Sequence, residues 1–258
     1  SDDRVMRQDD GMTTSDAASP ASTAAFTAGD VAAVTANVAT IADQLVSLSH
    51  EISADPELSY EEHRAAARCA DLLEKHGFDV ERGAYGLPTS FTARMGSGAT
   101  HVVICAEYDS LPGVGHACGH NVIGAAGVGA GIAAAALAEE IGGRVLVLGT
   151  PAEEGGGGKV ALAEAGAFEG VEAALMVHPA GLDLARIKAI AIHQLQVTYH
   201  GKAAHAAAAP HAGRNPLDAA VLGYQNVAAL RQHIRPDERI HGIFTEAGEA
   251  PNVVPARA

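Results

Sequence analysis

HVVICAEYDSLPGVGHACGHNVIGAAGVGAG, residues 101–131, places an apolar run, a polar loop and a run of small residues in direct succession. The apolar run His101–Ala106 is typical of a central parallel strand that is buried on both faces. The run Val122–Ala138 consists mostly of Ala and Gly, whereas membrane spans are normally richer in large aliphatic residues over about 20 residues. The stretch therefore predicts a buried strand, a loop at its carboxyl end and a helix packed closely on a sheet.

Strand and helix patterns alternate on both sides of this stretch. Apolar residues recur at helical spacing from Gly29 to about Ile52, and a second helical pattern ends at Gly77, in the position of a C-cap. We predict strands at Phe78–Arg82, Phe91–Met95, His101–Ala106, Arg144–Leu148 and Ala173–Val177, and a further helix at Lys159–Ala167. This order predicts an α/β fold, a mostly parallel sheet with helices on both faces. Functional residues are then expected just past the carboxyl ends of strands.

The pattern changes from about Leu184. Two strand-like segments, HQLQVTYHG and IHGIFTEAG, flank a helix predicted at Leu217–His233. This order resembles the first half of a small α+β, ferredoxin-like lid domain. Three elements leave an edge of such a sheet unpaired, so we expect an incomplete chain. The expected organisation is a disordered leader at 1–25, a metal-binding catalytic domain at 26–183 and an incomplete lid or dimerisation domain at 184–258.

Composition excludes some classes of partner. The chain has 258 residues, 48% of them apolar, a formal net charge of −14 and no Trp, which disfavours binding to nucleic acid. Three widely spaced cysteines do not form the even pattern of a secreted disulfide scaffold, so we expect a reducing, cytoplasmic environment. The first 25 residues match neither a signal peptide nor a membrane anchor.

The segment HACGH carries the first candidate site. If it is extended, Cys118 and His120 project from the same side, and a thiolate and an imidazole are both good zinc donors. Taken alone, a core Cys beside a capping His is an equally good interpretation. A nucleophilic thiol is a third interpretation, but it leaves the acidic pair of the next motif without a role.

The segment GTPAEEGGGG, residues 149–158, follows an apolar strand and carries two adjacent carboxylates. Neighbouring residues of an extended segment point to opposite sides, so one of Glu153 and Glu154 can bind a metal while the other activates water. A solvated acidic turn is the alternative. A phosphate-binding loop ending at Lys159 is excluded, because its first glycine would fall on Glu153 and Val160 lacks the hydroxyl.

Histidines follow in two further motifs. His178 ends the apolar run ALMVHP, where a structural hydrogen-bonding role is the common alternative to metal binding. In HGKAAHAAAAPHAGRNP, His205 can reach across a cleft, and His211 is expected to be a surface residue.

The motifs AEYDSLPGVGHACGH, PAEEGGGG, VHP, GKAAHAAAAPHAGRNP and PNVVP together resemble the aminoacylase and carboxypeptidase family of two-metal hydrolases. Within it, the chain is similar to the amidohydrolase subgroup with hippurate hydrolase, auxin-conjugate hydrolases and aminobenzoyl-glutamate hydrolase. The five motifs occur in the family's order, from PELSYEE to the last residue. The AEYD and HACGHN motifs favour the aminobenzoyl-glutamate and dipeptide-hydrolysing branch.

The resemblance implies a role for each matched residue. The implied metal ligands are Cys118, His120, Glu154 and His178; Glu153 is the implied general acid/base, Asp109 steadies a ligand, His205 polarises the carbonyl or its oxyanion, and Asn252 contacts substrate. Glu107 stands where other branches of the family have a ligand His. The resemblance also implies a further metal-binding His after Ala258.

The expected function is amide hydrolysis in small N-acyl amino acids, aminobenzoyl-glutamate-like compounds or dipeptides, with two divalent ions, zinc or manganese, as cofactors. A homodimer through the lid domain is expected, and a membrane partner is not. The alternative is an inactive, truncated family member that only binds or dimerises.

Overall fold

The computed structural model describes residues 28–138, 142–185, 187 and 191–258. The predicted leader at 1–25 lies outside the described residues. The described chain forms two compact units, the first ending at Leu182 and the second beginning at Asp183.

The first unit is built on a five-stranded sheet with the strand order β1-β2-β4-β3-β5. Its strands are β1 (Asp79–Arg82), β2 (Phe91–Met95), β3 (Thr100–Ala106), β4 (Gly143–Gly149) and β5 (Ala173–Leu175). β3 pairs in parallel with both β4 and β5, whereas β1 and β2 run antiparallel to their neighbours. The α/β class is confirmed, and the sheet is mixed, with its parallel strands at the centre and at the β5 edge.

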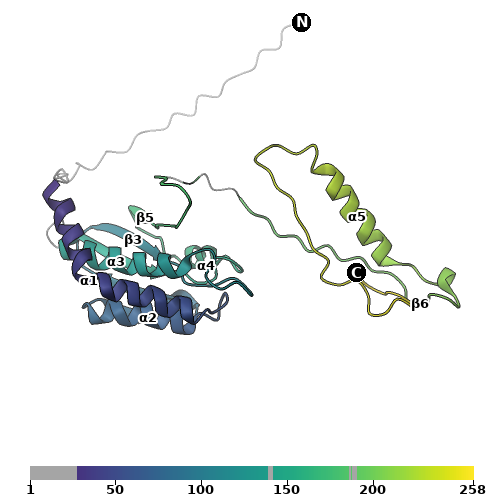
Figure 1. Cartoon of the computed structure of the whole chain (residues 1–258), viewed down its shortest axis with the longest axis horizontal. Coiled ribbons are helices and arrows are strands. Elements are labelled where there is room, and N and C mark those ends of the chain that lie inside the picture. Colours follow the sequence, from purple (N-terminus) through teal and green to yellow (C-terminus); the bar gives the residue numbers. More distant parts are fainter. Residues whose placement is uncertain (1–27, 139–141, 186, 188–190) are drawn as a thin grey trace, which may run out of the picture. The chain divides into compact units, whose positions relative to one another are not determined.

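Helices cover both faces of this sheet. α2 (His63–Lys75) and α3 (His120–Ala138) pack on one face, and α1 (Ala28–Ala54) packs against these two helices (Figure 1). α4 (Gly158–Glu164) packs on the other face. The sheet has an apolar core on each face, and alternate residues of β4 point into one or the other. Val147 faces the three-helix layer formed by α1, α2 and α3, and Leu146 and Leu148 face α4. A strand that is covered on both faces must be apolar at every position, as the run VLVL is.

The composition of α3 follows from how closely it approaches the sheet. A Cβ on Gly127 would lie 3.0 Å from the Cβ of Ala106, and one on Gly131 would overlap a methyl of Val147. Length and composition alone would also let α3 and α1 cross a membrane; 56% of the α3 window is buried inside the fold, as in core helices of soluble proteins, whereas 11% of the α1 window, near the N-terminus, is buried. The small residues bring α3 close to the sheet, so that its first residue, His120, lies beside the strand ends.

The second unit contains α5 (Pro216–Leu230), the short helix η2 (Pro210–Ala212) and two short antiparallel strands, β6 (Ala204–His205) and β7 (Val253–Val254). The strands predicted over HQLQVTYHG and IHGIFTEAG are wrong. In the first segment, backbone hydrogen bonds to Ala256 and Ala258 begin only at Tyr199. The second segment forms no strand pairing with any described residue. Alternating apolar residues give a segment strand character, but a strand also needs a hydrogen-bonded neighbour.

Candidate metal centre

The candidate site lies where three parallel strands of the first unit end. β3 is followed by Glu107 and Asp109, β4 by Glu153 and Glu154, and β5 by His178. Because β4, β3 and β5 are neighbours and run in the same direction, their carboxyl ends meet at one edge of the sheet. This is the edge at which open α/β sheets bind ligands.

The segment HACGH is a turn and not an extended strand, so this part of the prediction is wrong. Gly119 has a φ of +89°, and His120 is the first residue of α3. Gly119 also lies against Pro179, whose Cγ would be 2.9 Å from a Cβ at this position. The turn nevertheless brings Cys118 and His120 together with His178, with their donor atoms within 4.8 Å of one another.

Both imidazoles present the same nitrogen to this space. His120 Nδ1 lies 2.9 Å from Asp109 Oδ1, and His178 Nδ1 lies 2.7 Å from the carbonyl oxygen of Pro179. Since a carbonyl or a carboxylate accepts a proton from Nδ1, the lone pair of each ring is left on Nε2. Metal-binding histidines typically donate their second ring nitrogen in this way.

The two adjacent carboxylates approach His120 equally closely but differ in exposure. Glu153 Oε2 and Glu154 Oε1 both lie 3.8 Å from His120 Nε2, while the side chain of Glu153 is 43% exposed and that of Glu154 is 21% exposed. Glu154 Oε1 is buried without a hydrogen-bond partner in the described part of the chain. The better solvated Glu153 suits contact with water, and the less exposed Glu154 suits a ligand.

Asp109 joins the imidazole and the acidic pair. Besides His120, its carboxylate accepts hydrogen bonds from the backbone N–H of Glu154 and from the Ser59 hydroxyl, both at 3.0 Å. These bonds lower the pKa of Asp109 despite its burial, which alone would raise it. Asp109 therefore stays ionised and fixes both the ring of His120 and the backbone of Glu154.

Charges in the site shift two further pKa values. Burial alone would lower the pKa of His120, but Asp109 and the nearby carboxylates outweigh it, so the pKa lies above its ordinary value. Burial and the charge of Glu107 raise the pKa of Glu153. A carboxylate whose pKa is raised toward neutrality suits general acid/base work.

A thiol nucleophile fits these surroundings less well. Cys118 Sγ lies 3.5 Å from His178 Nε2, the arrangement of a Cys–His pair. Burial, a hydrogen bond with Glu154 and the surrounding carboxylates raise the pKa of the Cys118 thiol to about 11. Reactive cysteines have lowered pKa values in electropositive surroundings, whereas a bound cation deprotonates a coordinating thiol outright.

Three side chains at this edge of the sheet were assigned no role from the sequence, although Glu107 stands at a ligand position of other branches of the resembled family. Glu107 is buried and forms an ion pair with Lys159, whose place in the sequence suggested only a phosphate loop. Glu62, also buried, accepts a 2.8 Å hydrogen bond from the N–H of Ala152, whose φ is +56°. Glu107 follows an apolar strand just as Glu153 does, a signal that could have identified it; Glu62 lies ninety residues away from Ala152 and left no such signal.

The predicted residues of the second unit have other surroundings. His205 is exposed, and its Nδ1 accepts hydrogen bonds from the N–H groups of Ala207 and Ala208 at 3.2 and 3.1 Å, which leaves its proton on Nε2. Asn252 is also exposed, and its carbonyl oxygen accepts from the N–H of Ala206. His211 is exposed in η2, as expected for a surface residue.

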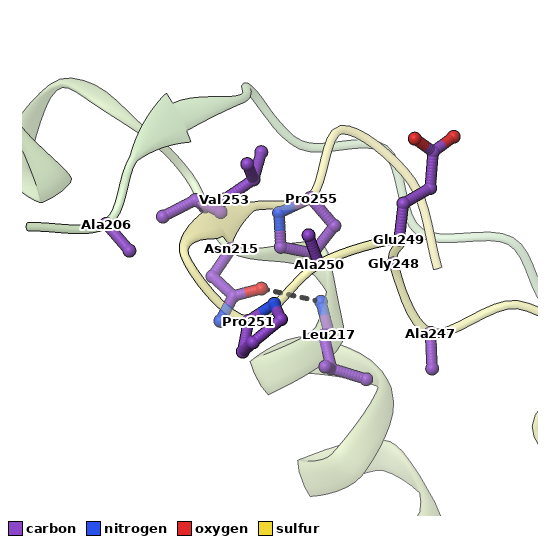
Figure 2. A pocket seen from close by; sticks show the side chains of 11 residues that line it. Ala206, Asn215, Leu217, Ala247, Gly248, Glu249, Ala250, Pro251, Val253 and Pro255 are labelled. Carbon is purple, nitrogen blue, oxygen red and sulfur yellow. Dashed lines mark hydrogen bonds between the residues drawn. The ribbon is translucent and has the colours of Figure 1, made fainter.

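A hollow of about 390 Å³ opens in the second unit beside β7 (Figure 2). Asn215, whose side chain accepts a hydrogen bond from the N–H of Leu217, lies on its wall. Among the described residues that line it, Glu249 has the only ionisable side chain. Asn252 is not among the lining residues. The described lining has one carboxylate and no His or Cys, so it lacks the donors found at the strand ends of the first unit.

Two observations show that a divalent cation fits the strand-end site. His120 Nε2, Glu107 Oε2 and Glu154 Oε1 are all buried with no hydrogen-bond partner among the described residues, although buried polar atoms are normally paired. The donors form two overlapping groups, Cys118 with His120 and His178, and Glu107 with His120 and Glu153, each within 4.8 Å. The predicted ligand Glu154 belongs to neither group, although its Oε1 lies 3.8 Å from His120 Nε2. Thiolate, imidazole and carboxylate are the donors of zinc and manganese sites.

The chain is similar to several curated proteins. It is 44% identical over 229 residues to a Xaa-Arg dipeptidase of Mus musculus, covering 83% of this chain and 53% of the relative. It is 36% identical over 232 residues to one subunit of the p-aminobenzoyl-glutamate hydrolase of Escherichia coli, covering 82% of this chain and 48% of the relative. The chain thus spans about half the length of these curated relatives.

The fold is shared with a solved structure, the aminobenzoyl-glutamate utilization protein from Klebsiella pneumoniae. The TM-score is 0.60 at 20% identity, covering 87% of this chain and 67% of the other. Residues 102–249 match the family described as peptidase family M20/M25/M40. The resemblance inferred from the five motifs is confirmed, and the chain belongs to this peptidase family.

Proposed function

We propose that the protein is a metal-dependent amidohydrolase that cleaves the amide bond of small dipeptides or N-acyl amino acids. One observation carries this proposal: a buried imidazole nitrogen, His120 Nε2, has no hydrogen-bond partner in the described chain and lies 3.8 Å from each of two carboxylates at one sheet edge. Membership of a peptidase family gives this arrangement its reaction class.

In the proposed site, Cys118, His120, Glu154 and His178 hold two divalent ions. When bound, such ions polarise an amide carbonyl and lower the pKa of a water molecule toward about 7. Asp109 accepts a hydrogen bond from Nδ1 of His120 and so keeps the proton on that nitrogen. The lone pair on Nε2 is then available to bind a metal ion.

Glu153 moves the proton in this proposal. Its carboxylate takes a proton from the attacking water and delivers it to the nitrogen of the departing amine. The Nε2–H of His205, fixed by the backbone hydrogen bonds to Nδ1, is suited to donate to the developing oxyanion. Asn252 is proposed as a further contact to the substrate.

The substrate class is narrowed by relatives and by charge. Relatives in mouse and human are named Xaa-Arg dipeptidases, while the relative in Escherichia coli is named for p-aminobenzoyl-glutamate. The formal net charge of −14 favours the approach of a cationic substrate over an anionic one. We therefore place dipeptides that end in a basic residue first.

Metal identity, compartment and assembly complete the proposal. A thiolate with two imidazoles favours zinc, while the carboxylates also admit manganese. Three free cysteines, two of them buried, support a reducing, cytoplasmic environment. Exposed apolar side chains in the second unit, such as Leu195 at 88%, support a homodimer through that unit.

Metal-loaded chain incubated with Ala-Arg and with p-aminobenzoyl-glutamate tests the function. We expect turnover of Ala-Arg that a chelator abolishes and that added Zn²⁺ or Mn²⁺ restores. The variant Glu153→Gln should retain the metal and lose turnover by about 100-fold or more. Glu81→Gln, which changes an exposed carboxylate on β1, is the matched control and should behave as the wild type. Turnover that resists chelation would instead favour a thiol nucleophile, and metal-loaded but inert protein a binding role.

A further inference from the structure

Glu107 is a buried carboxylate with a partner for only one of its two oxygens in the described chain. Its side chain is 1% exposed and follows β3 directly. Oε1 accepts from the ammonium group of Lys159, while Oε2 has no hydrogen-bond partner among the described residues. A buried charge of this kind is costly unless each oxygen is paired or binds a metal.

The free oxygen of Glu107 points at the candidate metal centre. Oε2 lies 3.4 Å from His120 Nε2, closer than either Glu153 or Glu154 comes to this nitrogen. The Nε2 atom is itself buried and unpartnered in the described chain. Two buried atoms that each carry a lone pair thus face each other beside the carboxylate of Glu153, and a cation between them would satisfy both.

Lys159 forms an ion pair with the other oxygen, Oε1. It is the second residue of α4, and its side chain is 32% exposed. The first residue of α4, Gly158, is packed so tightly that a Cβ there would overlap the carbonyl oxygen of Pro151. The start of α4 is therefore fixed against the loop after β4, and Lys159 reaches Glu107 from a defined place.

We propose that Glu107 is a further carboxylate ligand of the metal centre, beside His120, and that Lys159 is the positioning residue that turns its free oxygen toward the ion. This inference rests on the proposed function. The additional carboxylate makes this part of the centre richer in oxygen donors than the group formed by Cys118, His120 and His178. Because carboxylates suit manganese better than thiolates do, loss of Glu107 should weaken Mn²⁺ binding more than Zn²⁺ binding.

Calorimetric titration of the metal-stripped chain with Mn²⁺ and, separately, with Zn²⁺ tests the inference. Glu107→Gln should weaken Mn²⁺ binding by about 10- to 100-fold, and Lys159→Met should weaken it in the same direction. Lys159→Arg, which keeps the charge, should recover part of the affinity. The matched controls Glu81→Gln and Lys75→Met alter exposed groups on β1 and at the end of α2 and should bind as the wild type does.

Thermal unfolding of the metal-free proteins separates a ligand from a structural ion pair. If Glu107→Gln and Lys159→Met lower the unfolding temperature but leave both metal affinities within about twofold of wild type, the pair is only structural and the inference is overturned. Wild-type chain that binds neither ion would overturn the proposed function together with this inference. Wild-type chain that binds metal and turns over substrate while the Glu107 variant binds equally well would overturn the inference alone.

Discussion

At the scale of single residues, Gly119 decides whether the donors of two distant segments meet. It adopts a left-handed φ of +89°, and its missing side chain leaves room for Pro179, next to His178. Only glycine adopts this conformation without strain. The contact thereby couples the turn that carries Cys118 to the end of β5, sixty positions further along the chain.

Replacing Gly119 with Ala should both destabilise the protein and weaken metal binding. The left-handed backbone costs about 1–2 kcal/mol for a residue with a Cβ, and the overlap with Pro179 adds about 1–3 kcal/mol. Gly113→Ala is the matched control, because Gly113 also has a positive φ, +77°, but no atom within 4 Å of its would-be Cβ. Urea denaturation and metal titration of both variants check the expectation. Equal losses in the two variants would show that the contact with Pro179 has no role.

At the scale of elements, the segment just before α2 stabilises both the start of that helix and the loop that follows β4. The carboxylate of Glu57 accepts hydrogen bonds from the N–H groups of Arg64 and Ala65, at 2.9 and 2.8 Å, and so caps a helix whose N-cap residue, Glu62, makes no capping bond. Glu62 instead binds the N–H of Ala152, one residue before the acidic pair. A non-glycine residue with a left-handed φ costs about 1–3 kcal/mol, so the loop needs such support.

The buried carboxylate of Glu62 should make stability depend on pH in a defined direction. Burial raises its pKa, so the folded state binds the proton more tightly than the unfolded state, and this contribution to stability declines as the pH rises through the raised pKa. Glu62→Gln keeps an oxygen for Ala152 but does not titrate. Stability of the wild type relative to Glu62→Gln should therefore fall as the pH rises from the ordinary range of a glutamate pKa toward neutrality. Denaturant midpoints across this range measure it, and a constant or rising difference would contradict the assignment.

Local patterns predicted the elements of the first unit well and the arrangement of its site less completely. The continuous apolar runs of β3 and β4 mark buried strands, and the polar residues that follow them mark the ligand edge. The turn at HACGH was missed because a single glycine with positive φ cannot be distinguished by type from any other glycine. Glu62 and Lys159 act through contacts with residues about ninety and fifty positions away, and such contacts exist only once the sheet has formed.

At the scale of the whole molecule, the two units differ in how their apolar residues are covered. The first unit buries three apolar clusters against its sheet. Among the described residues of the second unit, only Pro216 and Ala220 are buried. The alternating apolar residues Leu195 and Val197 predicted a strand from local pattern, yet they are 88% and 66% exposed because no neighbouring segment pairs with them in the described chain. Pairing over long sequence distances is what local patterns do not encode.

This difference predicts where a protease will cut first. Thermolysin, which cleaves before large aliphatic residues, should act between Leu182 and Leu195, where the described residues are exposed and belong to no helix or strand. Leu175 is an internal control: it is 57% exposed, nearly as much as Leu184 at 58%, but it is held in β5 by pairing with β3 and should remain uncut. Mass spectrometry of a digestion time course should therefore show an early fragment that ends between residues 182 and 195 and outlasts the second unit. Early cleavage at Leu175, or within the three-helix layer, would show that the first unit is not the stable part of the chain.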